Sequence, residues 1–75
     1  MQRVINGLLY DTNTAVVVHI EEDTKRVLYH TANNNFFMLY PTGEIVPKTG
    51  YSVKEYLGKL NVKKYIELFG EPKEA

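Results

Sequence analysis

The stretch AVVVHIEEDTKRVLYHTANNNFFMLY, residues 15–40, decides the fold because it holds three apolar runs separated by two polar corners. Residues 15–21 are the most β-branched run of the chain and predict a central strand. Residues 26–31 and 36–40 predict two further strands, since each is apolar and bounded by turn-favouring residues. We therefore expect an antiparallel meander.

The first corner predicts a two-residue loop at Asp23-Thr24. This loop places Glu21 opposite Arg26, which pairs opposite charges, and His19 opposite Leu28. At the second corner, Asn33-Asn34 can form the turn because Asn tolerates the left-handed region of backbone space. That turn pairs Tyr29 with Met38 and His30 with Phe37.

These registers make both faces of the sheet apolar, although a small antiparallel sheet normally keeps one face in water. Two interpretations stay open for the second face. Either the second helix or the N-terminal hairpin covers it, or it is a protein interface or the seam of a homodimer. The first face carries Val16, Val18, Ile20, Val27, Tyr29, Phe36, Met38 and Tyr40. The second face, our candidate interface, carries Val17, Leu28, His30, Phe37 and Leu39.

Before the meander, the sequence RVINGLLYD of residues 3–11 predicts a hairpin. An Asn-Gly pair between apolar runs is the strongest short-range hairpin signal, because a type I′ turn needs positive φ at both central residues. Asn6-Gly7 as the turn places Ile5 opposite Leu8, and it places Val4 opposite Leu9.

After the meander, EIVP at residues 44–47 predicts a short strand, and Pro47 suits an edge position. From residue 51 the apolar period changes to 3.6, with Ser52 as the predicted helix cap and Tyr51 stapling against Tyr56. Two apolar stripes lie nine residues apart, so one straight helix cannot bury both. We therefore predict a break near Leu60-Asn61, with Asn61 capping a second short helix that ends at Gly70. The stripes are Val53, Tyr56, Leu57 and Leu60, and then Val62, Tyr65, Ile66 and Phe69.

Taken together, these patterns predict one α+β domain of 75 residues, with about five antiparallel strands followed by one broken or two short helices. Hydrophobic residues make up 44% of the chain and charged residues 24%, which is an ordinary globular composition. The chain has no cysteine, signal-like segment or membrane-length apolar run, so we expect a cytoplasmic protein stabilised by packing.

The chain has few residues that could serve in catalysis or metal binding. His19 and His30 are the only imidazoles, and a metal site would need Glu21 or Asp23 as a third ligand. Ser52 is the only serine and already serves as a cap, while Glu21, Glu22 and Asp23 fit a solvated corner. No glycine-rich phosphate loop occurs. We expect no enzyme, no metal and no cofactor.

Nucleic-acid binding is the second function class considered. Nine basic and nine acidic residues give a formal charge of +0, whereas nucleic-acid domains are usually basic. The candidate basic face is formed by Lys54, Lys59, Lys63 and Lys64, for which a solvated helix face is the favoured interpretation. Core packing likewise explains the six tyrosines and three phenylalanines better than base stacking does.

Four segments resemble a group of small, largely uncharacterised proteins of phages, prophages and Gram-positive bacteria. They are RVINGLLYDTNTA, LYHTANNNFFMLY, IVP and VKEYLGKLNVKKYIELFGE, in that order along nearly the whole chain. The group typically has RVINGKxYDTxTA, LYxTKxGEFFLY, IIPL, AKEWxE and EYExxFGE. This chain departs from it at Asn34, where Gly is usual, at Tyr56, where Trp is usual, and in a shorter segment after Tyr40. The resemblance implies a mobile-element origin and a binder that modulates or inhibits a host protein, anti-defence proteins included.

The sequence-level hypothesis is therefore a non-enzymatic module that binds another protein. A nucleic-acid-binding module that uses the sheet aromatics and the C-terminal lysines is the alternative. A structural protein that associates only with copies of itself is a third hypothesis.

Overall fold

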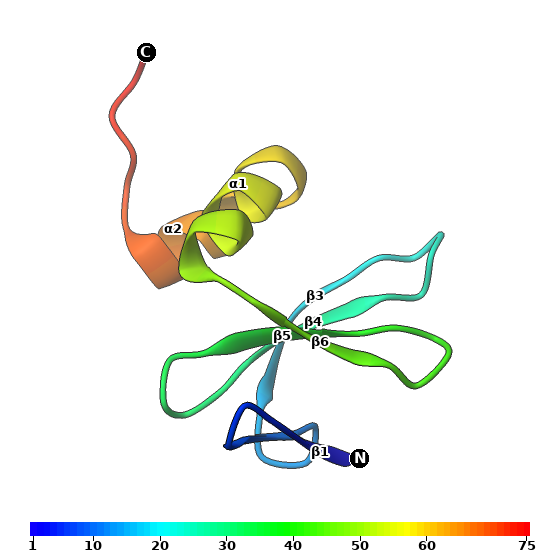
Figure 1. The fold of residues 1–75 in the computed structure, drawn as a ribbon. Helices are drawn as coiled ribbons and strands as arrows, with labels where there is room; N and C mark the ends of the chain where they lie inside the picture. The colour runs from blue at the N-terminus through cyan, green and yellow to red at the C-terminus, as the bar shows by residue number, and fades with distance from the viewer.

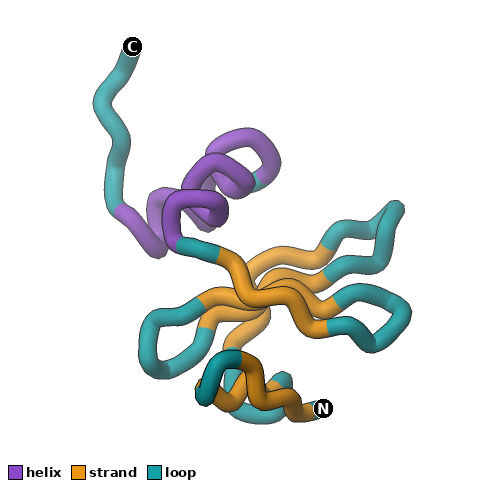
Figure 2. Tube along the Cα trace, in the orientation of Figure 1, coloured by secondary structure: helices purple, strands orange, loops and turns teal.

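The computed structural model describes residues 1–75 and contains six strands and two helices (Figure 1, Figure 2). β1 and β2 form a separate two-stranded sheet, and the other four strands form a sheet in the order β3-β4-β5-β6. The α+β meander with two C-terminal helices is confirmed. The elements are β1 (Gln2–Ile5), β2 (Leu8–Asp11), β3 (Val16–Ile20), β4 (Val27–His30), β5 (Phe36–Leu39), β6 (Ile45–Lys48), α1 (Gly50–Leu60) and α2 (Val62–Phe69).

The N-terminal hairpin has the predicted register. Asn6 and Gly7 both have positive φ, at 51° and 78°, as a type I′ turn requires. Ile5 pairs with Leu8, and Val4 pairs with Leu9. After β2, Asp11 turns the chain, because its Oδ1 accepts a hydrogen bond of 2.9 Å from the backbone N–H of Asn13.

The strand predicted to be central is instead an edge, because β3 pairs only with β4. His19 does lie opposite Leu28, and Glu21 exchanges backbone hydrogen bonds across the corner with Arg26 and Lys25. The predicted two-residue loop is wrong, because four residues form the corner and Lys25 takes a left-handed φ of 63°.

A β-bulge in β3 also changes the expected faces. Val17 lies opposite Tyr29 and His19 opposite Leu28, so Val18 is the extra residue between two paired positions. Val18 is buried in the core on the helix side of the sheet. The bulge therefore lets neighbouring residues of β3 depart from strict alternation, which a period-two pattern does not predict.

The predicted register between β4 and β5 is wrong by one residue. Tyr29 pairs with Phe37 and His30 with Phe36, since the turn has three residues between Thr31 and Asn35. Only Asn34 takes the left-handed region, with a φ of 64°. A one-residue slip moves every side chain of a strand to the opposite face. The prediction that Leu28 and Phe37 share one face is consequently wrong: Leu28 lies on the helix side and Phe37 on the hairpin side.

The far edge of the sheet matches expectation. β6 pairs only with β5, and Pro47 lies within it opposite Phe37. Proline suits an edge strand because it has no N–H to give to a ladder. Gly43, with a φ of 92°, forms the preceding turn by donating its N–H to the Tyr40 carbonyl at 2.9 Å.

The two helices follow β6 directly. Thr49 caps α1, because its Oγ1 accepts a hydrogen bond of 3.1 Å from the Ser52 N–H. The predicted cap at Ser52 is wrong because the helix begins at Gly50, two residues earlier, and Tyr51 is exposed instead of stapling against Tyr56.

The predicted break between the helices is confirmed. Asn61 separates α1 from α2, and its Oδ1 accepts a hydrogen bond of 3.1 Å from the Lys64 N–H. Gly70 ends α2 with a φ of 90° and donates its N–H to the Ile66 carbonyl. The break lets two short helices pack on the same sheet, where one straight helix could not bury both stripes.

The four-stranded sheet lies between the helices on one side and the β1–β2 hairpin on the other (Figure 1). Each side of the sheet has its own core. Of the two interpretations of the second apolar face, the one in which the N-terminal hairpin covers it is therefore correct for the central strands. On the hairpin side, the Phe37 ring stacks on Tyr29 at 4.9 Å and meets Tyr10 edge-on at 5.5 Å. The helix-side core is Val18, Leu28, Phe36, Met38, Val53 and Leu57, and the hairpin-side core is Tyr10, Phe37 and Ile45.

Neither helix has the length and apolar character needed to cross a membrane.

Phe37 provides a test of the hairpin-side core. Its side chain is 0% exposed, so Phe37→Ala should lower the free energy of unfolding by about 3–5 kcal/mol. Val4→Ala on the outer surface of the hairpin is the control, with an expected change of about 0.5 kcal/mol or less. Urea unfolding followed by circular dichroism measures both. Equal effects would contradict this packing.

Candidate functional site

The free edge of β3 carries exposed apolar residues. Val16 is 68% exposed and Ile20 is 51% exposed, with the half-exposed Val17 between them in sequence. All three are β-branched and lie on the only strand edge of the four-stranded sheet that lacks a proline. Such an edge presents unpaired backbone N–H and C=O groups beside apolar side chains.

A groove of about 160 Å³ runs between β3 and α2. Val16 and Val18 line it from the strand, and Leu68 lines it from the helix. Lys64 and Glu67 stand at the groove and form an ion pair at 3.6 Å. An exposed ion pair of this kind contributes little stability. Breaking it costs little free energy, so Lys64 and Glu67 can each pair with a charge on a bound partner.

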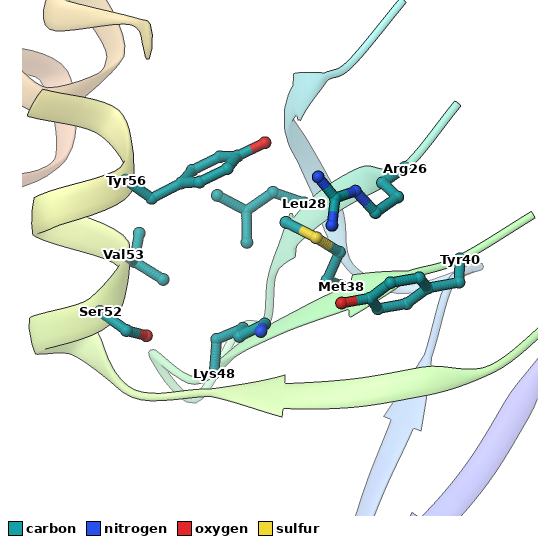
Figure 3. A pocket seen from close by; sticks show the side chains of 8 residues that line it. All are labelled: Arg26, Leu28, Met38, Tyr40, Lys48, Ser52, Val53 and Tyr56. Atoms are coloured by element: carbon teal, nitrogen blue, oxygen red, sulfur yellow. The ribbon is translucent and has the colours of Figure 1, made fainter. Parts of the chain in front are cut away.

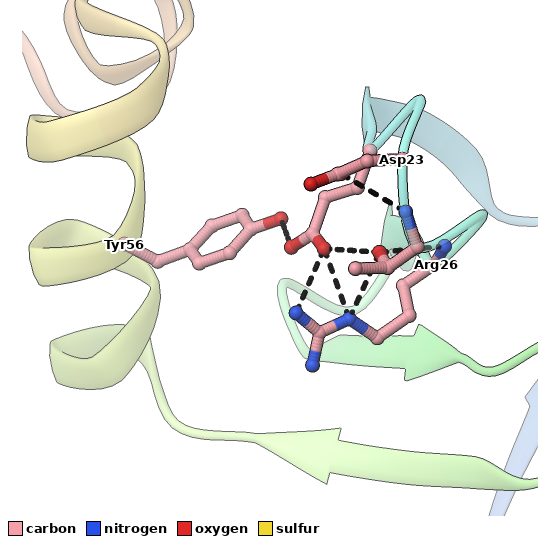
Figure 4. A network of polar contacts seen from close by, with 5 residues as sticks. Asp23, Arg26 and Tyr56 are labelled. Carbon is pink, nitrogen blue, oxygen red and sulfur yellow. Dashed lines mark hydrogen bonds and ion pairs between the residues drawn. The ribbon is translucent and has the colours of Figure 1, made fainter.

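At the other end of β3, a buried carboxylate joins the corner of the sheet to α1. Oε1 of Glu21 accepts hydrogen bonds from Arg26 Nε at 2.9 Å and from the Thr24 hydroxyl, and it lies 2.8 Å from Arg26 Nη2. The Tyr56 hydroxyl of α1 donates to Oε2 (Figure 4). The solvated-corner prediction is therefore wrong for Glu21, because Tyr56 covers it, while Glu22 and Asp23 are exposed.

These contacts set the ionisation of the pair. Burial by itself would raise the pKa of Glu21, but hydrogen bonds from Thr24, Tyr56 and Arg26 outweigh it and lower that pKa to about 2. Burial and the neighbouring Glu21 carboxylate raise the pKa of Tyr56 above its ordinary value of 10.0. At neutral pH, Glu21 is thus an ionised acceptor and Tyr56 is a protonated donor.

Arg26 and Tyr56 also border a pocket of about 200 Å³ between α1 and the strands β4, β5 and β6 (Figure 3). Its apolar surface comes from Leu28, Met38 and Val53, and its cations are Arg26 and Lys48. Arg26 additionally lies over the Tyr40 ring, with 5.5 Å between its guanidinium carbon and the ring centroid. No acidic residue lines the pocket.

The structure does not bring the five candidate interface residues onto one face. Leu28 is buried beneath the helices and Phe37 beneath the hairpin, because the register differs from the predicted one. Leu39 packs against the hairpin-side core, and His30 is half-buried on the helix side. Of the five, Val17 is the only one that is exposed, at 43%.

The four candidate basic residues lie on both helices. Lys54 and Lys59 are about 140° apart around α1, so they do not share one face. Nζ of Lys54 lies 5.3 Å from the centroid of the Phe69 ring, and Lys64 pairs with Glu67. Lys63 is exposed on α2. The lysines therefore do not form a single stripe for a phosphate backbone.

Both histidines have structural partners. Nδ1 of His19 lies 3.2 Å from Asn61 Nδ2, and its ring meets Tyr56 edge-on. His30 stacks on Phe36 at 4.5 Å, and its Nε2 lies 2.8 Å from Asn34 Oδ1. No group of three or more His, Cys, Asp or Glu side chains is placed to hold a metal ion.

Sequence reasoning missed two features of the site. It paired Glu21 with Arg26, but no local pattern indicated that Tyr56, 35 residues away, would complete the network. It also assigned no role to Lys48, which follows Pro47 at the end of β6 and reaches the pocket. The signal for Lys48 was its place at a strand-to-helix junction, where a side chain can face the gap between sheet and helix.

The fold and these surfaces define a class, a small α+β domain whose four-stranded sheet is covered by helices on one face and by a hairpin on the other. Comparisons with protein-family models, curated proteins and solved structures find no match to this chain.

The Glu21 network predicts a specific pH dependence. The folded-state pKa of about 2 lies below the ordinary glutamate pKa of 4.5, so ionised Glu21 stabilises the fold fully above about pH 5 and progressively less as the pH falls toward 2. Between about pH 3 and 5, the free energy of unfolding should rise more in the wild type than in Glu21→Gln. Urea unfolding across this range measures the slopes, and equal slopes would contradict the network.

Tyr56→Phe tests the helix side of the same network. Removing the hydroxyl leaves Glu21 Oε2 without its donor and should cost about 1–3 kcal/mol at pH 7. In the Glu21→Gln background the same substitution should cost less, because no buried charge remains. Tyr51→Phe, which changes an exposed tyrosine, is the matched control and should have no effect on urea unfolding.

Proposed function

We propose that this chain is a non-enzymatic protein-binding module that binds an extended segment of another protein along the free edge of β3. The observation that carries the proposal is the exposure of Val16 and Ile20 on an unpaired strand edge. In strand addition, backbone hydrogen bonds supply affinity and flanking side-chain positions supply selectivity.

The contrast between the two sheet edges supports this choice. Natural proteins protect edge strands with proline, lysine or bulges, and β6 carries both Pro47 and Lys48. β3 has only the bulge at Val18, which leaves apolar side chains exposed on both sides of it. The protection of β3 is therefore partial, and the groove beside α2 can receive a side chain of the added strand.

The biological setting is the second part of the proposal. The resemblance of RVINGLLYDTNTA and the later segments to small phage and prophage proteins supports a bacterial, cytoplasmic setting. Small proteins in that setting often act by binding a larger host protein, so modulation or inhibition of such a protein, of the anti-defence type, is the activity we propose.

Nucleic-acid binding is the weaker alternative. Its aromatic platform would need Phe36 and Phe37, which are both buried, and its basic face would need lysines that do not share one side. Self-association is the third possibility, because a second copy of the chain on the β3 edge would bury the same residues as a strand of another protein. The experiment therefore also measures the oligomeric state.

Affinity capture from a bacterial lysate tests the proposal with charge-matched variants. Val16→Lys combined with Ile20→Lys adds two charges to the β3 edge, whereas Tyr51→Lys combined with Leu60→Lys adds two charges to exposed apolar positions on α1. We expect one protein to be retained by the wild type and the α1 variant, and to be reduced at least about tenfold by the β3 variant.

Circular dichroism first confirms that both variants are folded. Retention of the same protein by the β3 variant, or of no protein by the wild type, would contradict the proposal. Capture of nucleic acid that is lost at high salt would support the alternative instead. A dimer in sedimentation that the β3 variant dissociates would assign the edge to self-association.

A further inference from the structure

The pocket between α1 and the sheet carries positive charge in a chain whose formal charge is +0. Two cationic side chains line it, Arg26 from the corner just before β4 and Lys48 from the end of β6, and no acidic side chain does. Figure 3 shows both side chains at the opening between α1 and the strands. Convergent polar groups around an apolar surface are the usual composition of a small-ligand site.

The two cations differ in their available charge. Arg26 gives Nε and Nη2 to Glu21 (Figure 4), and its guanidinium also lies against the Tyr40 side chain, so its charge is already balanced. Lys48 forms no ion pair. The pocket therefore has one uncompensated positive charge, with the paired guanidinium beside it. This balance matches a ligand with a single negative charge.

The volume of the pocket and its apolar lining limit the class of ligand further. The volume of about 200 Å³ is below the range of roughly 300–1,000 Å³ that drug-sized ligands occupy. Leu28, Met38 and Val53 form the apolar part of the surface. A short apolar body that ends in a charged head group would cover these three residues and place its charge at Lys48.

We propose that this pocket binds a small monocarboxylate with an apolar body. The carboxylate accepts a hydrogen bond from Lys48 Nζ and lies beside the Arg26 guanidinium, and the body packs on Leu28, Met38 and Val53. The Tyr56–Glu21 contact fixes Arg26 at the pocket, so the site is preorganised by the fold. This inference goes beyond the proposed protein-binding function and does not depend on it, because the pocket is built on α1, β4, β5 and β6 and not on the free edge of β3.

Benzoate is the probe, and benzamide is its neutral isostere. Titration followed by amide chemical shifts in nuclear magnetic resonance should show saturable shifts around Lys48 and Val53, with a dissociation constant on the order of 1 mM for benzoate. Benzamide should bind about tenfold more weakly, because its neutral amide cannot form an ion pair with Lys48.

Two lysine variants complete the experiment. Lys48→Met removes the charge and keeps the aliphatic stem, so it should weaken benzoate about tenfold and weaken benzamide much less. Lys59→Met on the exposed surface of α1 is the control and should change neither affinity. The proposal is overturned if benzoate causes no saturable shifts, if benzamide binds equally well, or if Lys59→Met weakens benzoate as much as Lys48→Met does.

Discussion

The structure depends on the burial of both faces of one short strand, β5. Phe36 and Met38 are buried on the helix side, and Phe37 between them is buried on the hairpin side. A chain of this size buries only about 60% of the surface that its unfolded form exposes, so it cannot leave either face of its most apolar strand in water. Without a cysteine to cross-link it, the chain folds both of its ends back onto β5, one as a hairpin and the other as two helices.

The Glu21 carboxylate joins these layers at a second point. A buried charge is costly unless it is paired and hydrogen-bonded, and here three side chains supply donors. The network therefore fixes where α1 crosses the sheet, since Tyr56 must reach Glu21. It also fixes the guanidinium of Arg26 over Tyr40, so one structural ion pair determines the shape and charge of the neighbouring pocket.

Local signals in the sequence predicted the local structure well. The Asn6-Gly7 turn and the helix break at Asn61 were both correct, because each depends on the backbone preference of one or two residues. The sheet faces were not, because one extra residue at Val18 and one in the turn before β5 change the alternation without changing the apolar pattern. For the same reason, Glu21 and Arg26 could be paired in advance, but their distant partner on α1 could not.

The meander has a consequence for the speed of folding. Every strand pairs with a strand adjacent to it in the sequence, so the ladders form by closing short loops, and this favours faster folding than a sheet of distant strands would allow. Other contacts join distant segments, and two of them, Glu21 with Tyr56 and His19 with Asn61, link β3 and the corner after it to α1 and its C-cap. Because α1 begins two residues after β6 ends, docking of the helices on the formed sheet closes only a short connection and adds little entropic cost.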